Sequence, residues 1–182
     1  MRRLNFSGAG ILCLTCVMLL ATTPSCKRKQ RTQAQVTPEE QVGLVSTVHA
    51  ADPRAAVQFV KGFYEPEAGA WRWTTGQFAV TLKPPKDAAQ KGANLTLKFV
   101  AHEAVMKRLH SITLSAKVGT LDLKPETYTN PGEYTYTREV PASALGGDAV
   151  TVNFSLDKVL PAGEIDQREL GVIVSVAGLE TK

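Results

Sequence analysis

The sequence predicts an all-β domain, an antiparallel, jelly-roll-like β-sandwich of about eight or nine strands. Short runs in which apolar and polar residues alternate recur from residue 55 onward, as in Leu95-Thr96-Leu97-Lys98-Phe99. A period of two is typical of strands with one buried face. Clusters of Gly, Pro, Asn and Asp separate these runs. Many short strands without a long helix favour two packed antiparallel sheets.

The expected strands follow one another in the order of these runs. They span residues 57–60, 63–64, 71–74, 77–82, 93–101, 112–116, 121–123, 133–140, 150–156 and 170–176. We expect residues 112–116 and 121–123 to pair as a hairpin through the turn at Gly119. Residues 103–109 and 141–147 are expected to form short helical turns or loops.

The first 26 residues have the order of a secretory signal. Arg2 and Arg3 precede an apolar stretch at 9–21, and a small polar run then leads to Cys26. The stretch is shorter than the roughly 20 residues that span a bilayer. We therefore expect a signal peptide at 1–25, a basic and polar tether at 26–52 and the sandwich at 53–182.

A cysteine directly after such a run resembles the lipobox of bacterial lipoproteins, in which this cysteine is lipidated and becomes the new N-terminus. Ser25 is the small residue that the motif has before its cysteine, whereas Thr23 stands where an aliphatic residue is usual. The resemblance implies attachment of acyl chains such as palmitate at Cys26, with membrane lipid as the partner. It places the protein in the bacterial cell envelope, at the outer membrane or cell surface. An uncleaved anchor and ordinary signal-peptidase cleavage are the alternatives.

The net charge of +4 belongs to the leader and the tether rather than to the sandwich. Six of the 21 Lys and Arg residues precede residue 32, whereas all 17 acidic residues follow it. The sandwich is therefore mildly acidic, which argues against a nucleic-acid partner. All three cysteines lie within the first 26 residues, so the sandwich has no disulfide and no Cys metal site. We expect no cofactor and no metal.

Three segments resemble a small jelly-roll-like β-sandwich that recurs in bacteria beside glycosyltransferases and other sugar- and envelope-related enzymes. They are residues 62–67 with 71–74, the middle hairpin with Pro141 and Leu145, and residues 166–172. The resemblance implies an accessory domain that is similar to carbohydrate-binding domains.

Trp71 and Trp73 are the first candidates for ligand binding. Two residues apart on a strand, they share one face, where an exposed pair would stack against sugar rings. A buried Trp contributes roughly 150–250 Å² to a core, so core packing of at least one of them is the favoured alternative.

Glu65 and Arg168 are the other candidates for a binding edge. Glu65 and Glu67 precede a turn and are expected to meet Arg72 or Arg168, because arginine and carboxylate form paired hydrogen bonds. Structural pairing is favoured over contact with a polyol.

The sequence offers little for catalysis, and we expect no catalytic residue. The three histidines lack a metal-ligand spacing. Glu65 and Asp166 would resemble a glycosidase carboxylate pair, but the sequence does not set their separation. We therefore expect a non-catalytic envelope protein that binds a carbohydrate or a partner protein. A structural component of an envelope complex and a glycan hydrolase are the alternatives.

Overall fold

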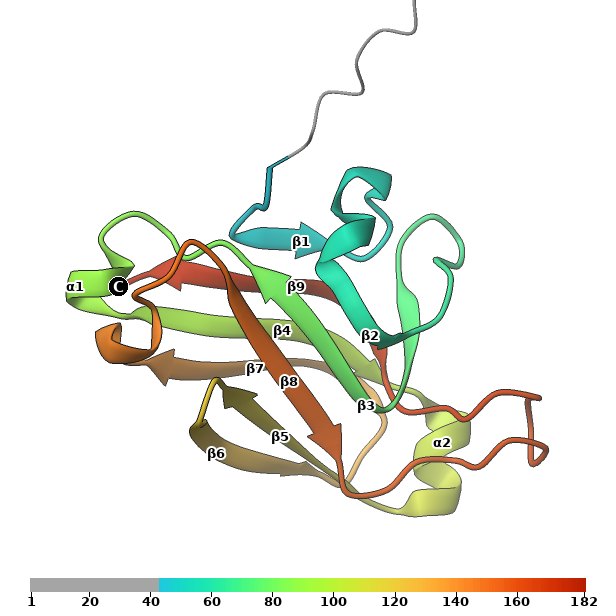
Figure 1. Cartoon of the computed structure of the whole chain (residues 1–182). Coiled ribbons are helices and arrows are strands. Elements are labelled where there is room, and N and C mark those ends of the chain that lie inside the picture. The colour runs from blue at the N-terminus through green and yellow to red at the C-terminus, as the bar shows by residue number, and fades with distance from the viewer. Residues whose placement is uncertain (1–42) are drawn as a thin grey trace, which may run out of the picture. The chain divides into compact units, whose positions relative to one another are not determined.

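Nine strands and four short helices make up residues 43–182, the part of the chain that this computed structural model describes (Figure 1). The strands are β1 (Thr47–His49), β2 (Phe59–Phe63), β3 (Arg72–Leu82), β4 (Ala93–Ala101), β5 (Ile112–Val118), β6 (Leu121–Tyr128), β7 (Gly132–Val140), β8 (Val150–Leu156) and β9 (Ile173–Thr181). The helices are η1 (Pro53–Gln58), α1 (Ala88–Lys91), α2 (Glu103–Leu109) and η2 (Ala142–Ala144). The predicted signal peptide, Cys26 and most of the predicted tether lie outside the described residues.

The strands form two sheets in which every pairing is antiparallel. In sheet A, β7 pairs with β4 and β4 with β9, and β9 also pairs with β1 and with the beginning of β3. In sheet B the order is β2, β3, β8, β5 and β6. Figure 1 shows β3 and β8 crossing over β4, β7 and β9. The predicted antiparallel β-sandwich with about nine strands is confirmed, as is the hairpin of β5 and β6.

One strand, β3, belongs to both sheets. Arg72 and Trp73 pair with β9 in sheet A, whereas residues 77–82 pair with β8 in sheet B. Thr74 lies at the change of sheet and is completely buried. Its backbone N–H donates to the Val172 carbonyl at 2.9 Å and its hydroxyl accepts from the Val172 N–H at 3.1 Å. These bonds hold the segment before β9 against the point at which β3 leaves sheet A.

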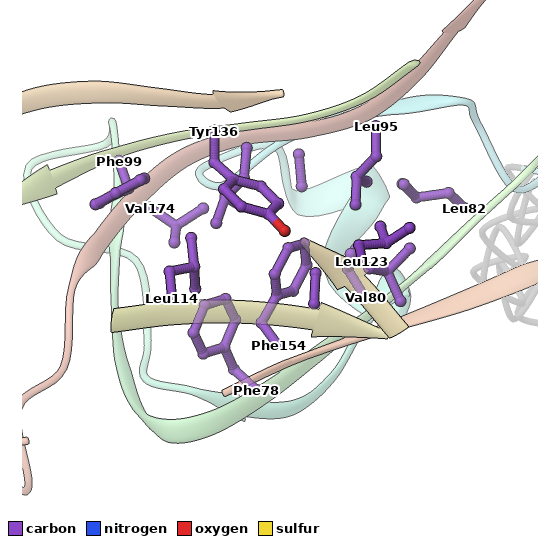
Figure 2. Close-up of a cluster of buried hydrophobic side chains, with 14 of the residues drawn as sticks. Phe78, Val80, Leu82, Leu95, Phe99, Leu114, Leu123, Tyr136, Phe154 and Val174 are labelled. Carbon is purple, nitrogen blue, oxygen red and sulfur yellow. The ribbon is translucent and has the colours of Figure 1, made fainter. Parts of the chain in front are cut away.

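The core lies between the inner faces of the two sheets (Figure 2). Leu95, Leu97 and Phe99 point inward from β4, as their alternation predicts. Phe78 and Phe154 face them from sheet B, with their rings stacked at 5.0 Å. Because these side chains come from neighbouring strands of both sheets, their burial fixes the register in which the sheets pack.

Several segments differ from the predicted elements, and residues 72–82 form one strand, β3, where two were predicted. Residues 53–58 form η1 instead of beginning a strand, since the Asp52 side chain caps the helix by accepting from the Arg54 N–H at 2.9 Å. The last strand spans 173–181 rather than 170–176. β1 pairs with β9, so the sandwich begins within the segment expected to be tether. Among residues 43–182, no helix is long and apolar enough to cross a membrane.

Candidate functional site

Three segments meet at the end of the sandwich where β3 begins. They are the loop at 64–71 between β2 and β3, helix α2, and the long segment at 157–172 between β8 and β9. Two of the three segments on which the sequence resemblance rests, 62–74 and 166–172, are thereby brought together. Candidate site residues separated by about 100 positions in the sequence therefore lie at one place.

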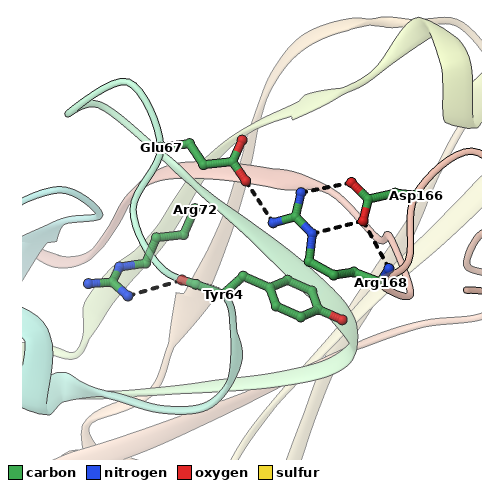
Figure 3. Close-up of polar contacts among 5 residues, drawn as sticks. All are labelled: Tyr64, Glu67, Arg72, Asp166 and Arg168. Carbon is green, nitrogen blue, oxygen red and sulfur yellow. Dashed lines mark hydrogen bonds and ion pairs between the residues drawn. The ribbon is translucent and has the colours of Figure 1, made fainter.

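Arg168 is the centre of a polar cluster that we call the Arg168 cluster, formed with Tyr64, Glu67 and Asp166 (Figure 3). Its Nε donates to Asp166 Oδ1 at 3.0 Å and its Nη2 to Asp166 Oδ2 at 2.9 Å. Its Nη1 donates to Glu67 Oε1 at 2.6 Å. The guanidinium also lies 5.1 Å from the centre of the Tyr64 ring, within cation–π range.

These contacts shift the proton affinities of the cluster. Hydrogen bonds from the Arg168 side chain and backbone lower the pKa of Asp166 to about 2. Hydrogen bonds to Asp166 and Glu67 raise the pKa of Arg168. Asp166 and Arg168 are therefore both charged at neutral pH. The cluster ties the 64–71 loop to the 157–172 segment, with about a third of the Arg168 side chain exposed.

Arg72 lies apart from the carboxylates and is buried. Its Nε donates to the Ala50 carbonyl at 2.7 Å and its Nη1 to the Tyr64 carbonyl at 3.0 Å. Glu67 thus pairs with Arg168 and not with Arg72. Glu65 is exposed and forms no ion pair with any residue of the range 43–182.

Trp71 and Trp73 lie against one small apolar cluster but differ in burial. Trp73 is 8 % exposed and packs with Val105 of α2 and Leu160 of the long segment. The His102 ring lies 5.5 Å from the Trp73 ring. Trp71 is only partly buried against the edge of this cluster. Trp73 is therefore a core residue, whereas Trp71 keeps surface that a ligand can reach.

Trp71 lines an open depression on the outer face of sheet A, which we call the Trp71 groove. Its volume of about 460 Å³ lies within the range of roughly 300–1,000 Å³ that is typical of small-molecule sites. Its lining includes Trp71, Lys98, Val100, Glu133, Thr135 and Ser175. Lys98 and Glu133 are exposed, and neither forms an ion pair within residues 43–182.

Trp71 was predicted as a candidate from the sequence, but the polar residues that line this groove were not. They occupy outward positions of three strands, and the register of sheet A places Lys98 opposite Thr135 and Val100 opposite Glu133. Outward polar positions can be recognised from the alternation of each strand. Their assembly around Trp71 depends on which strands are neighbours.

Asp166 does not have the properties of the acid in a glycosidase-like carboxylate pair. The Asp166 carboxylate accepts three hydrogen bonds from Arg168 and is ionised far below neutral pH, so it is not a proton donor of the kind that glycoside hydrolysis requires. Within residues 43–182, no three His, Cys, Asp or Glu side chains are grouped so as to hold a metal ion.

Comparison with known proteins identifies no family. No protein-family model matches the sequence, and no curated protein matches it. The solved structures that are similar to parts of the chain include a glucuronidase and two carbohydrate-binding modules. A family GH115 4-O-methyl-α-glucuronidase with specificity for decorated arabinogalactans is 10 % identical, with a TM-score of 0.45 over 76 % of this chain and 18 % of the glucuronidase. The chain thus spans about a fifth of that protein's length.

The other two structures are carbohydrate-binding modules. The CBM36-1 domain of a xylanase from the hindgut metagenome of Trinervitermes trinervoides is 12 % identical, with a TM-score of 0.33 over 58 % of this chain and 71 % of the domain. A CBM4 structure is 11 % identical, with a TM-score of 0.35 over 75 % of this chain and 85 % of that one. These low similarities assign neither a family nor a ligand, and the fold class follows from the strand register itself.

Proposed function

We propose that this domain is a non-catalytic glycan-binding module whose ligand lies in the Trp71 groove. The observation that carries the proposal is the half-buried Trp71 indole at the edge of an open groove with hydroxyl, ammonium and carboxylate groups beside it. An aromatic ring offers a flat apolar surface for the C–H face of a sugar. The polar groups around it are suited to hydrogen bonds with the sugar hydroxyls.

The Arg168 cluster supports this proposal because it holds the loop that carries Trp71. Within this loop the Glu67 N–H donates to the Trp71 carbonyl at 2.8 Å, and the Glu67 side chain accepts from Arg168. A side chain that is ordered before binding loses less conformational entropy when the ligand arrives. Arg168 is therefore a positioning residue in this proposal rather than a ligand contact.

Glycan-array screening of the purified protein, followed by calorimetry on the best ligand, tests the proposal. Replacing Trp71 by Ala should weaken binding by roughly tenfold or more, since aromatic anchors in central pockets dominate binding energy. Lys98→Ala should weaken binding as well. The matched control is Lys117→Ala, which removes an exposed lysine from β5 in sheet B and should leave binding unchanged.

Three results would contradict the proposal. Full affinity of the Trp71→Ala variant would place the ligand elsewhere. Absence of binding to any glycan, together with stable capture of one envelope protein, would favour the structural role in an envelope complex. Turnover of a polysaccharide that is lost on replacing Glu65 would favour the hydrolase.

We also propose that Cys26 is lipidated and that the domain is tethered to a membrane of the bacterial cell envelope. The order of charged, apolar and small polar residues before Cys26 supports this. Mass spectrometry of the mature protein should find an acylated Cys26 at the N-terminus. Cys26→Ser should abolish acylation, whereas Cys13→Ser and Cys16→Ser, which change cysteines within the leader, should not. An unacylated N-terminus at another residue would contradict the proposal.

A further inference from the structure

Exposed valines gather at the corner where the described chain enters the sandwich. Among residues 43–182, the large hydrophobic side chains with substantial exposure are Val45, Val57, Val60 and Ile165. Val57 is 74 % exposed and Val60 is 54 % exposed. We call Val45, Val57 and Val60 the valine corner. Single exposed apolar residues are common, but a group at one place marks an interaction surface.

A buried glutamine holds this corner in place. Gln58 follows Val57 and is 2 % exposed. Its Oε1 accepts from the Val45 N–H at 3.0 Å, and its Nε2 donates to the carbonyls of Val45 at 3.0 Å and Thr81 at 2.7 Å. The amide thereby joins the entering chain, the end of η1 and the end of β3. The valines are thus presented on a fixed scaffold rather than on a loose terminus.

The acidic side chains of the segments around the valine corner, Asp52 and Asp87, are paired with Arg54 and Lys91, so Lys83 and Lys86 leave an excess of positive charge there. The Lys83 N–H donates to the Val45 carbonyl at 3.1 Å, and Lys86 follows three residues later. Both lysines are exposed, and neither has an ion-pair partner within the described part of the chain. Upstream, Lys27, Arg28, Lys29 and Arg31 precede the corner in the sequence.

The valine corner and the Trp71 groove lie at opposite ends of β3. Trp71 immediately precedes the first residue of β3, and Lys83 immediately follows the last. Because a strand rises about 3.3 Å per residue, the two ends of this strand are up to roughly 33 Å apart. A surface that covers the valine corner therefore leaves the Trp71 groove open.

We propose that the valine corner rests against a lipid bilayer, with its valines among the headgroups and with Lys83 and Lys86 facing anionic phosphates. Apolar side chains beside cations suit such an interface. A protein partner fits less well, because valine is under-represented among the residues that dominate protein interfaces. The inference rests on the proposed lipid attachment at Cys26. The chain from Cys26 to Gly43 can extend by at most about 60 Å, so the corner can reach the membrane.

Fluorescent labels at the two ends of the sandwich test this orientation. Acylation consumes Cys26 and cleavage removes Cys13 and Cys16, so an introduced cysteine is the single free thiol of the mature protein. Ala56 beside the valine corner and Ala162 near the Arg168 cluster are both exposed, and each is replaced by Cys in a separate variant. The full lipidated protein carries the environment-sensitive fluorophore NBD and is reconstituted into phosphatidylcholine vesicles containing phosphatidylglycerol.

At position 56 we expect stronger and blue-shifted emission from protein in vesicles than from the same labelled protein in buffer without lipid or detergent. At position 162 we expect no shift. The double variant Val57→Ser, Val60→Ser should lose the shift at position 56. Ile165→Ser, which changes the exposed hydrophobic residue outside the corner, should retain it.

The outcomes distinguish the bilayer contact of the valine corner from the lipid attachment at Cys26 on which it rests. Protein that floats with the vesicles but shows no shift at position 56 overturns the bilayer contact and leaves the lipid attachment standing. Equal shifts at positions 56 and 162 also overturn it, since the domain would then have no preferred orientation. Protein that fails to float with the vesicles overturns the lipid attachment and the bilayer contact together.

Discussion

Arg168 Nη1 and Glu67 Oε1 form a 2.6 Å hydrogen bond between residues that are 101 positions apart in the sequence. With the Asp166 pairing, this bond closes the loop before β3 onto the segment before β9. The loop before β3 carries Trp71, which lines the groove, and the segment before β9 packs against Trp73 through Leu160 and Leu170. The geometry of the candidate site therefore depends on a contact between distant parts of the chain.

Loss of the Arg168 guanidinium should loosen the Trp71 loop. We expect Arg168→Gln to lower Tm by a few degrees, since charge-assisted hydrogen bonds are lost at a partly exposed site. Arg168→Lys should recover only part of the loss, because an ammonium cannot pair with both oxygens of Asp166 while also reaching Glu67. Thermal unfolding followed by circular dichroism measures both. An unchanged Tm for both variants would show that the cluster does not stabilise the loop.

The Arg168 cluster should also make stability depend on pH in the acid range. The pKa of Asp166 is lowered from 3.8 to about 2 in the folded protein. A group with a lowered folded pKa stabilises the fold above its unfolded pKa and loses this effect as pH falls through the folded value. The Tm difference between the wild type and Asp166→Asn should therefore be constant above pH 3.8 and shrink toward pH 2.

The matched control for this pH dependence is Asp122→Asn. Asp122 pairs with Lys117 at 3.4 Å but its side chain is 79 % exposed, and such surface pairs contribute little. A Tm difference between the wild type and Asp122→Asn should stay small at every pH. If the Asp166→Asn difference were equally flat, the pairing with Arg168 would not be the source of the acid sensitivity.

The two tryptophans should separate stability from binding. Trp73→Ala should cost about 3–5 kcal/mol of unfolding free energy, because it leaves a cavity among Val105, Leu160 and Ile173. Trp71→Ala should cost far less, because Trp71 is only partly buried. Urea unfolding monitored by circular dichroism gives both values, and Trp73→Phe controls for partial filling of the cavity. Equal costs for the two alanine variants would contradict the assignment of Trp71 to the groove and Trp73 to the core.

Gly62 in β2 should not tolerate a side chain. Its φ is +71°, and a Cβ there would clash with the backbone carbonyl of Gln77. We expect Gly62→Ala to destabilise the protein by several kcal/mol, since both the backbone conformation and the packing oppose it. Gly119 has a similar φ of +58° with open space around it, so Gly119→Ala should cost only about 1 kcal/mol. Similar Tm values for the two variants would contradict the close packing at Gly62.

The sequence was sufficient for strands with a clear apolar alternation. Residues 93–101 and 150–156 have the predicted bounds, because Leu97 and Phe154 alternate with polar neighbours along strands that are buried on one face. β1 was not predicted, since only Val48 among its three residues is buried. Val57 belongs to η1 and not to a strand, because the cap at Asp52 outweighs the β propensity of a single valine.

The site residues could be nominated from the sequence but not assigned to roles. Glu65 and Glu67 have the same side chain and lie two residues apart, and either was expected to meet Arg72 or Arg168. Which pairs form depends on the fold, because β3 turns Arg72 toward the Ala50 and Tyr64 carbonyls while the segment before β9 brings Arg168 to Glu67. Local patterns hold no information about contacts of this sequence separation.

The pairing of Val48 with Ala177 makes the first and last strands of the sandwich neighbours. β9 also lies between β4 and the beginning of β3, so the central strand of sheet A is the last strand in the sequence. Contacts that close such long loops cost chain entropy before they stabilise the fold. Proteins rich in such contacts fold in milliseconds to seconds. The domain should therefore fold slowly and only after its whole length is free to collapse, as a single late event rather than strand by strand from the N-terminus.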